Sequence, residues 1–162
     1  MPAVKPWPAD PSDALVVVFR QIAEKRMQGL PICNAALAVE AIGFRRRDDG
    51  HWAGVLITPW GINLLCLPGD EMHWPSLNPT EKHWWAFPSG DYEFTVAEES
   101  SLGIYHLCSL FSPALEFPDQ AQARLTALAI VHALFADESV APVPVTETPR
   151  ASGRRAFLGL GR

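Results

Sequence analysis

The chain has 162 residues, of which 48% are apolar and 19% charged, so it is long enough for a core and is not of disordered composition. Its net charge of -5 and its pI of about 5.5 argue against a general nucleic-acid binder, which needs a basic surface. No apolar h-region of the kind found in secretory signals follows Met1, and no run of about 18 apolar residues appears. We therefore expect a soluble, cytoplasmic protein without stable membrane association or nucleic-acid binding.

The N-terminal part of the chain is predicted to be an arm and a helix. Residues 1–11 contain four prolines and are expected to form a flexible arm. Apolar side chains at helical spacing predict a helix that is capped by Ser12 or Asp13 and runs to about Gln28. Gly29 then ends it.

Two predicted strands and a turn follow. Residues 37–46 have the pattern of a strand, and the turn 48–50 joins them to the next strand in a hairpin. The basic cluster at 45–47 is more simply interpreted as a solvated strand end than as a binding site.

The stretch from Trp52 to Pro68 contains two further apolar runs of β type. Between them lies Thr58-Pro-Trp-Gly61, where Pro59 marks a bend or a sheet edge. We expect this bend to hold Trp60 at a rim, as a lid on the core or as a contact surface.

Residues 70–90 are predicted to be loop-rich, yet they carry Trp74, Trp84, Trp85 and Phe87. These rings must either fold back over the core or offer an apolar patch to a partner. Beyond them, residues 91–98 and 104–111 are predicted to pair as an antiparallel hairpin.

A last helix is predicted from the cap Asp119 to about Ala136. Helical spacing assigns its inner side to Leu125, Leu128, Val131, His132 and Phe135. The order of elements predicts an α+β fold over residues 12–138: a meandering antiparallel sheet of about five strands with both helices on one face. Residues 139–162 are predicted to be a Pro-rich linker and a tail.

The histidines and cysteines do not predict a catalytic or metal site. Cys33, Cys66 and Cys108 are separate and lie in apolar contexts, as buried structural cysteines do. His106 and Cys108 should share one face of a strand, but no third group orients them. A transient metal site at His73 and His83 stays open, although their spacing matches no ligand pattern. We predict a non-enzyme without cofactor or metal.

The C-terminal tail is more informative about function than the histidines and cysteines are. Arg154-Arg-Ala-Phe-Leu158 resembles the core of a twin-arginine export signal, but it lies near the C-terminus and cannot direct export by the usual route. It is either a chance basic and apolar tail or a mimic of a signal peptide that the protein handles. In the second case Arg154, Arg155, Phe157 and Leu158 are its key residues.

Several motifs together resemble the HybE/HupJ family of NiFe-hydrogenase maturation chaperones. They are Trp52-Ala-Gly54, Ile57-Thr-Pro-Trp60, Leu67-Pro-Gly69, Trp74-Pro75, Pro88-Ser-Gly90, Phe94-Thr-Val96, Tyr105 and Cys108-Ser-Leu-Phe-Ser-Pro113. The tail also fits, and the resemblance covers about residues 15–136. Some relatives carry a rubredoxin unit with paired Cys-x-x-Cys motifs, which are absent from this chain, so electron transfer is not implied.

The resemblance implies a cytoplasmic, non-catalytic protein that assists assembly of an uptake hydrogenase before export. Its partners would be the small subunit, through its signal peptide, the large-subunit precursor, or both. Aromatic and acidic side chains could receive the apolar part and the arginines of such a peptide. From clustering in the sequence we expect these to be Trp60, Trp74, Trp84 and Trp85, with Glu71, Glu81, Asp91 and Glu93.

Three alternatives are left open at this stage. The tail could fold back into the cargo groove and compete with cargo, or dock onto a partner. The protein could instead be a small enzyme or redox accessory that uses Cys108, which requires an accessible thiol of low pKa. Lastly, it could be a plain assembly scaffold that does not contact the signal peptide.

Overall fold

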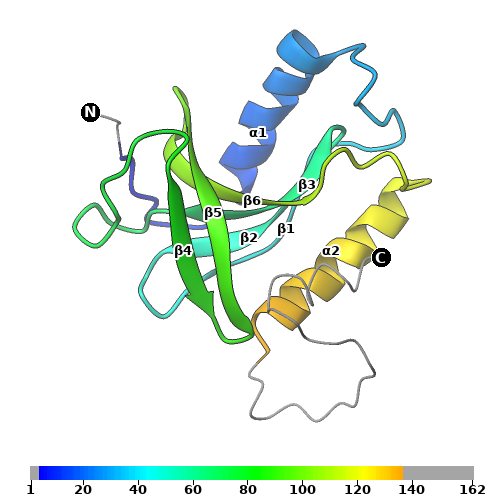
Figure 1. Cartoon of the computed structure of the whole chain (residues 1–162). Coiled ribbons are helices and arrows are strands. Elements are labelled where there is room, and N and C mark those ends of the chain that lie inside the picture. Colours follow the sequence, from blue (N-terminus) through cyan, green and yellow to red (C-terminus); the bar gives the residue numbers. More distant parts are fainter. Residues whose placement is uncertain (1–3, 137–162) are drawn as a thin grey trace.

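A computed structural model describes residues 4–136, which form one antiparallel sheet and two main helices (Figure 1). In chain order the elements are α1 (Ser12–Ile22) with a short π-helical continuation η1 (Ala23–Met27), β1 (Glu40–Arg46), β2 (Trp52–Thr58), β3 (Gly61–Leu67), β4 (Lys82–Phe87), β5 (Gly90–Glu99), β6 (Gly103–Phe111) and α2 (Gln120–Leu134).

The sheet consists of two three-stranded meanders that are joined side by side. Its strand order is β1-β2-β3-β6-β5-β4, so β3 pairs with β6 while β1 and β4 form the two edges. The predicted hairpins of β1 with β2 and of β5 with β6 are confirmed. The prediction of about five strands missed β4, because it lies in the segment that we expected to be a loop.

The α+β class is confirmed, but the two helices lie on opposite faces of the sheet. Leu15 and Phe19 of α1 pack with Leu56 of β2 in one buried cluster, the α1-side cluster. Ala127 of α2 packs with Val55 of β2 in the other, the α2-side cluster. All seven residues of β2 are buried, because each face of this strand is covered by a different helix. The prediction that both helices share one face was therefore wrong.

Close packing of α2 depends on a bulge in β1. The register of β1 with β2 shifts between Ile42 and Arg45, and Gly43 within this bulge has a φ of 66°. A Cβ at Gly43 would lie 2.8 Å from the side chain of Val131 in α2. Glycine is thus required both for the left-handed backbone and for the approach of the helix.

The helix ends are partly as predicted. The Asp119 carboxylate accepts a hydrogen bond from the Gln122 amide at 2.9 Å, which confirms this residue as the cap of α2. At α1, neither Ser12 nor Asp13 caps the helix through its side chain. Instead, the Asp10 carboxylate accepts from the Ser12 amide at 2.9 Å. Gly29, with a φ of 81°, follows the π-helical turn.

Helix α2 buries a different face from the predicted one. Its buried residues are Ala123, Ala127, Ile130, Val131 and Leu134. Leu125 and Leu128 are 62% and 47% exposed, and His132 is exposed as well, so these three assignments were wrong. The helix is apolar around much of its circumference, and helical spacing alone could not choose which side faces the sheet.

The described part of the N-terminal segment lies on the sheet. The Trp7 amide donates to the Pro68 carbonyl, and the Trp7 carbonyl accepts from the indole of Trp52, both at 2.9 Å. The Pro8 carbonyl accepts from Arg46 at 2.8 Å. The Lys5 ammonium also donates to the Ser100 carbonyl at 3.1 Å, so four hydrogen bonds join residues 4–11, which we expected to be a flexible arm, to distant parts of the fold.

Candidate functional site: the two sides of strand β4

The four tryptophans proposed for partner binding are not gathered on one surface. Trp84 is 57% exposed, whereas Trp74 and Trp85 are only 5% and 6% exposed. Trp60 lies in the turn between β2 and β3 and is half-buried against the α1-side cluster. Of the four, Trp84 is therefore the one whose ring offers most of its surface to a partner.

Strand β4 separates these rings because neighbouring side chains in a strand point to opposite faces. The outward face forms what we call the β4 strip, in which residues of β4 and β5 are paired across the strands. It consists of Lys82 with Thr95, Trp84 with Glu93, and Ala86 with Asp91. Thr95 also pairs with Leu107, which packs at the border of the α1-side cluster, so the strip extends the α1 side of the sheet.

The structure brings together three of the predicted partner-binding residues: Trp84, Glu93 and Asp91. The Lys82 ammonium donates to the Thr95 hydroxyl at 2.9 Å, so one cation lies on the strip beside the two carboxylates. Glu81 precedes β4, and its carboxylate accepts from the Asn78 amide at 2.8 Å. Glu71 lies apart from the strip, exposed in the loop between β3 and β4.

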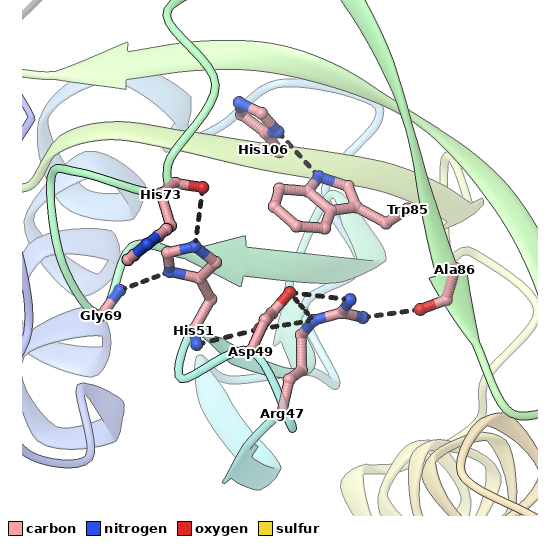
Figure 2. Close-up of polar contacts among 8 residues, drawn as sticks. All are labelled: Arg47, Asp49, His51, Gly69, His73, Trp85, Ala86 and His106. Carbon is pink, nitrogen blue, oxygen red and sulfur yellow. Dashed lines mark hydrogen bonds and ion pairs between the residues drawn. The ribbon is translucent and has the colours of Figure 1, made fainter.

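On the opposite side of β4, Trp85 belongs to a buried cluster of aromatic and imidazole rings (Figure 2). Trp74 folds back from the β3–β4 loop, and its ring centroid lies 5.2 Å from that of Trp85 and 4.5 Å from that of His106. The His51 ring is 5.0 Å from Trp74. We call these four residues the His–Trp cluster.

Hydrogen bonds fix the tautomers of both buried histidines in this cluster. The Gly69 amide donates to Nδ1 of His51 at 2.9 Å, so the His51 proton is on Nε2, which lies 3.2 Å from the His73 carbonyl. The indole of Trp85 donates to Nδ1 of His106 at 2.9 Å (Figure 2). His106 is therefore neutral, with its proton on Nε2.

Burial strongly favours the neutral form of His106. Desolvation, with smaller contributions from His83 and His51, lowers its pKa to about 3. Burial also lowers the pKa of His83, whose ring centroid lies 5.7 Å from that of His106. His106 thus packs behind β4 in its neutral form.

Arg47 connects this support to the turn between β1 and β2. Its guanidinium pairs with Asp49 at 3.0 Å and donates to the Ala86 carbonyl at 2.9 Å (Figure 2). It also lies over the rings of Trp85 and Phe87, at 4.9 and 4.7 Å from their centroids. The pair with Arg47 and the His51 amide outweigh burial and lower the pKa of Asp49. Arg47 therefore joins the two halves of the sheet.

The other two arginines of the cluster 45–47 also have structural contacts. Arg45 lies 4.3 Å over the Phe135 ring and Arg46 lies 4.6 Å over the Trp52 ring. The interpretation of this cluster as a solvated strand end is correct for Arg45 and Arg46, which are exposed at the end of β1, but not for Arg47, which is half-buried. The hairpin register placed each arginine near the turn, but only the folded sheet brings the aromatic rings under them.

The cysteines lack the environment of a reactive thiol. Cys66 and Cys108 are buried, as predicted, and Cys33 is half-buried. Burial raises the pKa of the Cys66 thiol, and Cys108 is 5% exposed. Within residues 4–136 no three His, Cys, Asp or Glu side chains are grouped as metal ligands require. His73 is instead within 3.2 Å of Asp70.

The fold and the β4 strip define the class: an open-sheet α+β domain with an aromatic and acidic surface at one edge. The model of the family described as NiFe-hydrogenase assembly chaperone HybE matches residues 10–160. The chain therefore belongs to this family of hydrogenase maturation chaperones. No helix within residues 4–136 is long and apolar enough to span a lipid bilayer.

Known relatives agree with this assignment. The chain is 44% identical over 147 residues to hydrogenase expression/formation protein HupT of Azotobacter chroococcum mcd 1, covering 91% of this chain and 96% of that protein. It is 41% identical over 143 residues to the probable rubredoxin HupJ of Rhodobacter capsulatus, covering 88% of this chain but 49% of the relative. The solution structure of HybE from Escherichia coli matches with a TM-score of 0.66 at 24% identity, covering 92% and 89%, and supports the fold.

The predicted signal mimic, Arg154 to Leu158, lies outside the described residues. Sequence reasoning also missed Arg47, Asp49 and His51, which position the inner side of β4. The Asp-Asp-Gly turn indicated a hairpin there but gave no sign that its side chains reach across the sheet.

Proposed function

We propose that this chaperone binds the twin-arginine signal peptide of a hydrogenase small subunit at the β4 strip, in the cytoplasm and before assembly and export. The observation that carries the proposal is the pair of Trp84 and Glu93, which are directly opposed on β4 and β5, with Trp84 57% exposed. It acts by binding alone, without catalysis, nucleic acid or stable membrane attachment.

The chemistry of the strip suits such a peptide. A twin-arginine signal offers two guanidinium groups next to an apolar segment. Glu93 and Asp91 supply carboxylates for charge-assisted hydrogen bonds, and the exposed face of Trp84 can receive a guanidinium or an apolar side chain. The His–Trp cluster packs behind β4 and holds Trp85, the neighbour of Trp84, by a hydrogen bond to His106. Such support lowers the entropy that the strand would lose on binding.

The proposal is tested with the full chain and a fluorescently labelled twin-arginine signal peptide. We expect Trp84→Ala to weaken binding about tenfold or more, since exposed aromatic anchors are typical hot spots. Glu93→Gln should weaken it less and should reduce its dependence on salt. The matched control is Val17→Ala, which removes an exposed apolar side chain, 55% exposed, from α1.

Equal affinity of wild type and both strip variants would refute the site. A pull-down from hydrogenase-expressing cells, with and without the signal peptide on the small subunit, shows whether the chaperone binds the small subunit, the large-subunit precursor or both. Retention of the large-subunit precursor alone, unaffected by loss of the signal peptide, would favour a scaffold. Loss of hydrogenase maturation on Cys108→Ser, with the fold intact, would favour the Cys-dependent alternative, although burial of Cys108 argues against it.

A further inference from the structure

The outward face of α2 is an apolar surface that the described residues leave uncovered. Five exposed residues recur at helical spacing along one side of the helix: Ala121, Leu125, Leu128, Ala129 and His132. We call them the α2 stripe. Leu125 and Leu128 are two of the eight large apolar side chains that are markedly exposed within residues 4–136, and they lie one helical turn apart.

Such a stripe is unusual on a free helix. Surface helices of globular proteins normally place charged and polar side chains opposite the buried face. Here Ala127, Ile130 and Leu134 form the buried face, and the opposite, exposed face of the helix also carries leucine and alanine. An apolar helix face of this kind is stabilised when a second apolar segment covers it.

We infer that the α2 stripe is the docking site of the protein's own C-terminal segment, residues 154–160. This segment contains three large apolar side chains in four positions: Phe157, Leu158 and Leu160. The α2 stripe provides two adjacent leucines between small alanines, into which larger side chains can pack.

The length of chain after α2 permits this contact. Helix α2 has 15 residues and is therefore about 22 Å long. About 19 residues separate its end from Arg154, and they would span about 24 Å as a flexible coil or at most about 59 Å as polyproline II. The segment can thus reach either end of the stripe.

Acidic side chains just before α2 can pair with the two arginines of the segment. Glu116 and Asp119 are exposed just before the helix. With Arg154 and Arg155 placed there, Phe157 and Leu158 would come to lie over Leu125 and Leu128. Tethering provides an effective concentration of about 1 mM, so an intrinsic Kd of about 0.1 mM keeps the segment docked about nine-tenths of the time.

Limited trypsin digestion of the full chain tests the contact, because docking protects Arg154 and Arg155 from cleavage. We expect the double variant Leu125→Asp, Leu128→Asp to be cleaved at these sites about tenfold faster than wild type. The matched control Val17→Asp should be cleaved at the wild-type rate. Circular dichroism verifies that each variant stays folded, as expected for exposed positions.

The reciprocal variant Phe157→Ser, Leu158→Ser should show the same acceleration, after correction for the rates measured on free peptides of residues 145–162. Its amide NMR spectrum should differ from wild type at Leu125 and Leu128. Equal cleavage rates in wild type and variants would overturn the inference. Spectral changes at Trp84 and Glu93 in place of Leu125 and Leu128 would also overturn it. So would protection from trypsin that increases with protein concentration and accompanies a doubled molecular mass, because the contact would then form between two chains. No signal peptide is used, so the outcome is independent of the proposed function.

Discussion

The two sides of β4 show how neighbouring tryptophans acquire different roles. Trp85 is 6% exposed, donates a hydrogen bond to His106 and lies under Arg47, whereas Trp84 is 57% exposed and opposes Glu93. The inner side of β4 stabilises the fold, whereas the outer side forms an exposed surface that a partner could contact. A single residue's shift in the register of β4 would exchange these roles, so the register of the β4–β5 hairpin decides which ring can meet a partner.

Removing the inner ring should have the largest effect. We expect Trp85→Ala to lower the free energy of unfolding by about 3–5 kcal/mol, because it leaves a cavity and removes the donor to His106. Urea denaturation measures the loss. Trp85→Phe is the partner variant, which keeps most of the ring volume and should cost less. A loss below about 1 kcal/mol for Trp85→Ala would contradict the buried role.

Arg47→Ala should come next, with a loss of about 1.5–3 kcal/mol in the free energy of unfolding. The substitution leaves Asp49 and the Ala86 carbonyl without their cationic donor and uncovers the rings of Trp85 and Phe87. Arg47→Lys keeps the charge but cannot reproduce the forked contacts, so it should recover only part of the loss. Full recovery by lysine would mean that charge alone matters.

The neutral His106 predicts a dependence of stability on pH. Its pKa in the folded protein, about 3, lies below the value of about 6.5 expected in the unfolded chain. Between these values the unfolded chain binds more protons, so stability is complete above pH 6.5 and falls as the pH is lowered. The slope should approach about 1.4 kcal/mol per pH unit.

Denaturation of wild type and His106→Gln at pH 7 and pH 5 checks this dependence. The variant should lose less stability over that interval than wild type does. His83, whose pKa is also lowered by burial, keeps part of the slope. The lowered carboxyl pKa values of Glu40 and Asp49 act only at more acidic pH. An unchanged slope in His106→Gln would show that His106 is not protonated on unfolding.

Trp84→Ala should have the smallest effect on stability, below about 1 kcal/mol, because it removes only a cross-strand contact on an exposed surface. The same substitution should remove a component of tryptophan fluorescence that acrylamide quenches readily. A large loss of stability would instead place Trp84 in the core and remove the contrast between the two sides.

Part of the fold could be predicted because it depends on local patterns. The turn at Asp48-Asp49-Gly50, the alternation in β5 and the cap Asp119 are each determined by a few adjacent residues. Strand β4 carried such a pattern as well, since His83, Trp85 and Phe87 alternate with Lys82, Trp84 and Ala86. It was missed because the neighbouring prolines and polar residues favoured a loop.

The sequence predicted the type of candidate site but not which residues form it. An excess of tryptophan with nearby acidic residues indicated a contact surface, and one tryptophan with two acids do meet on the β4 strip. The burial of Trp74 and Trp85 depends on rings from three distant segments. No local pattern specified that Arg47 would reach from the β1–β2 turn to the Ala86 carbonyl.

By itself the sequence determined the α+β class, the hairpins and the family, since these follow from side-chain periodicity, turn residues and short motifs. Tertiary structure alone decided which face each helix covers, which side of α2 is buried and which tryptophan stays exposed. The physical reason is that β2 and α2 are apolar on more than one side. Their burial is therefore set by what packs against them, which is a property of the whole fold.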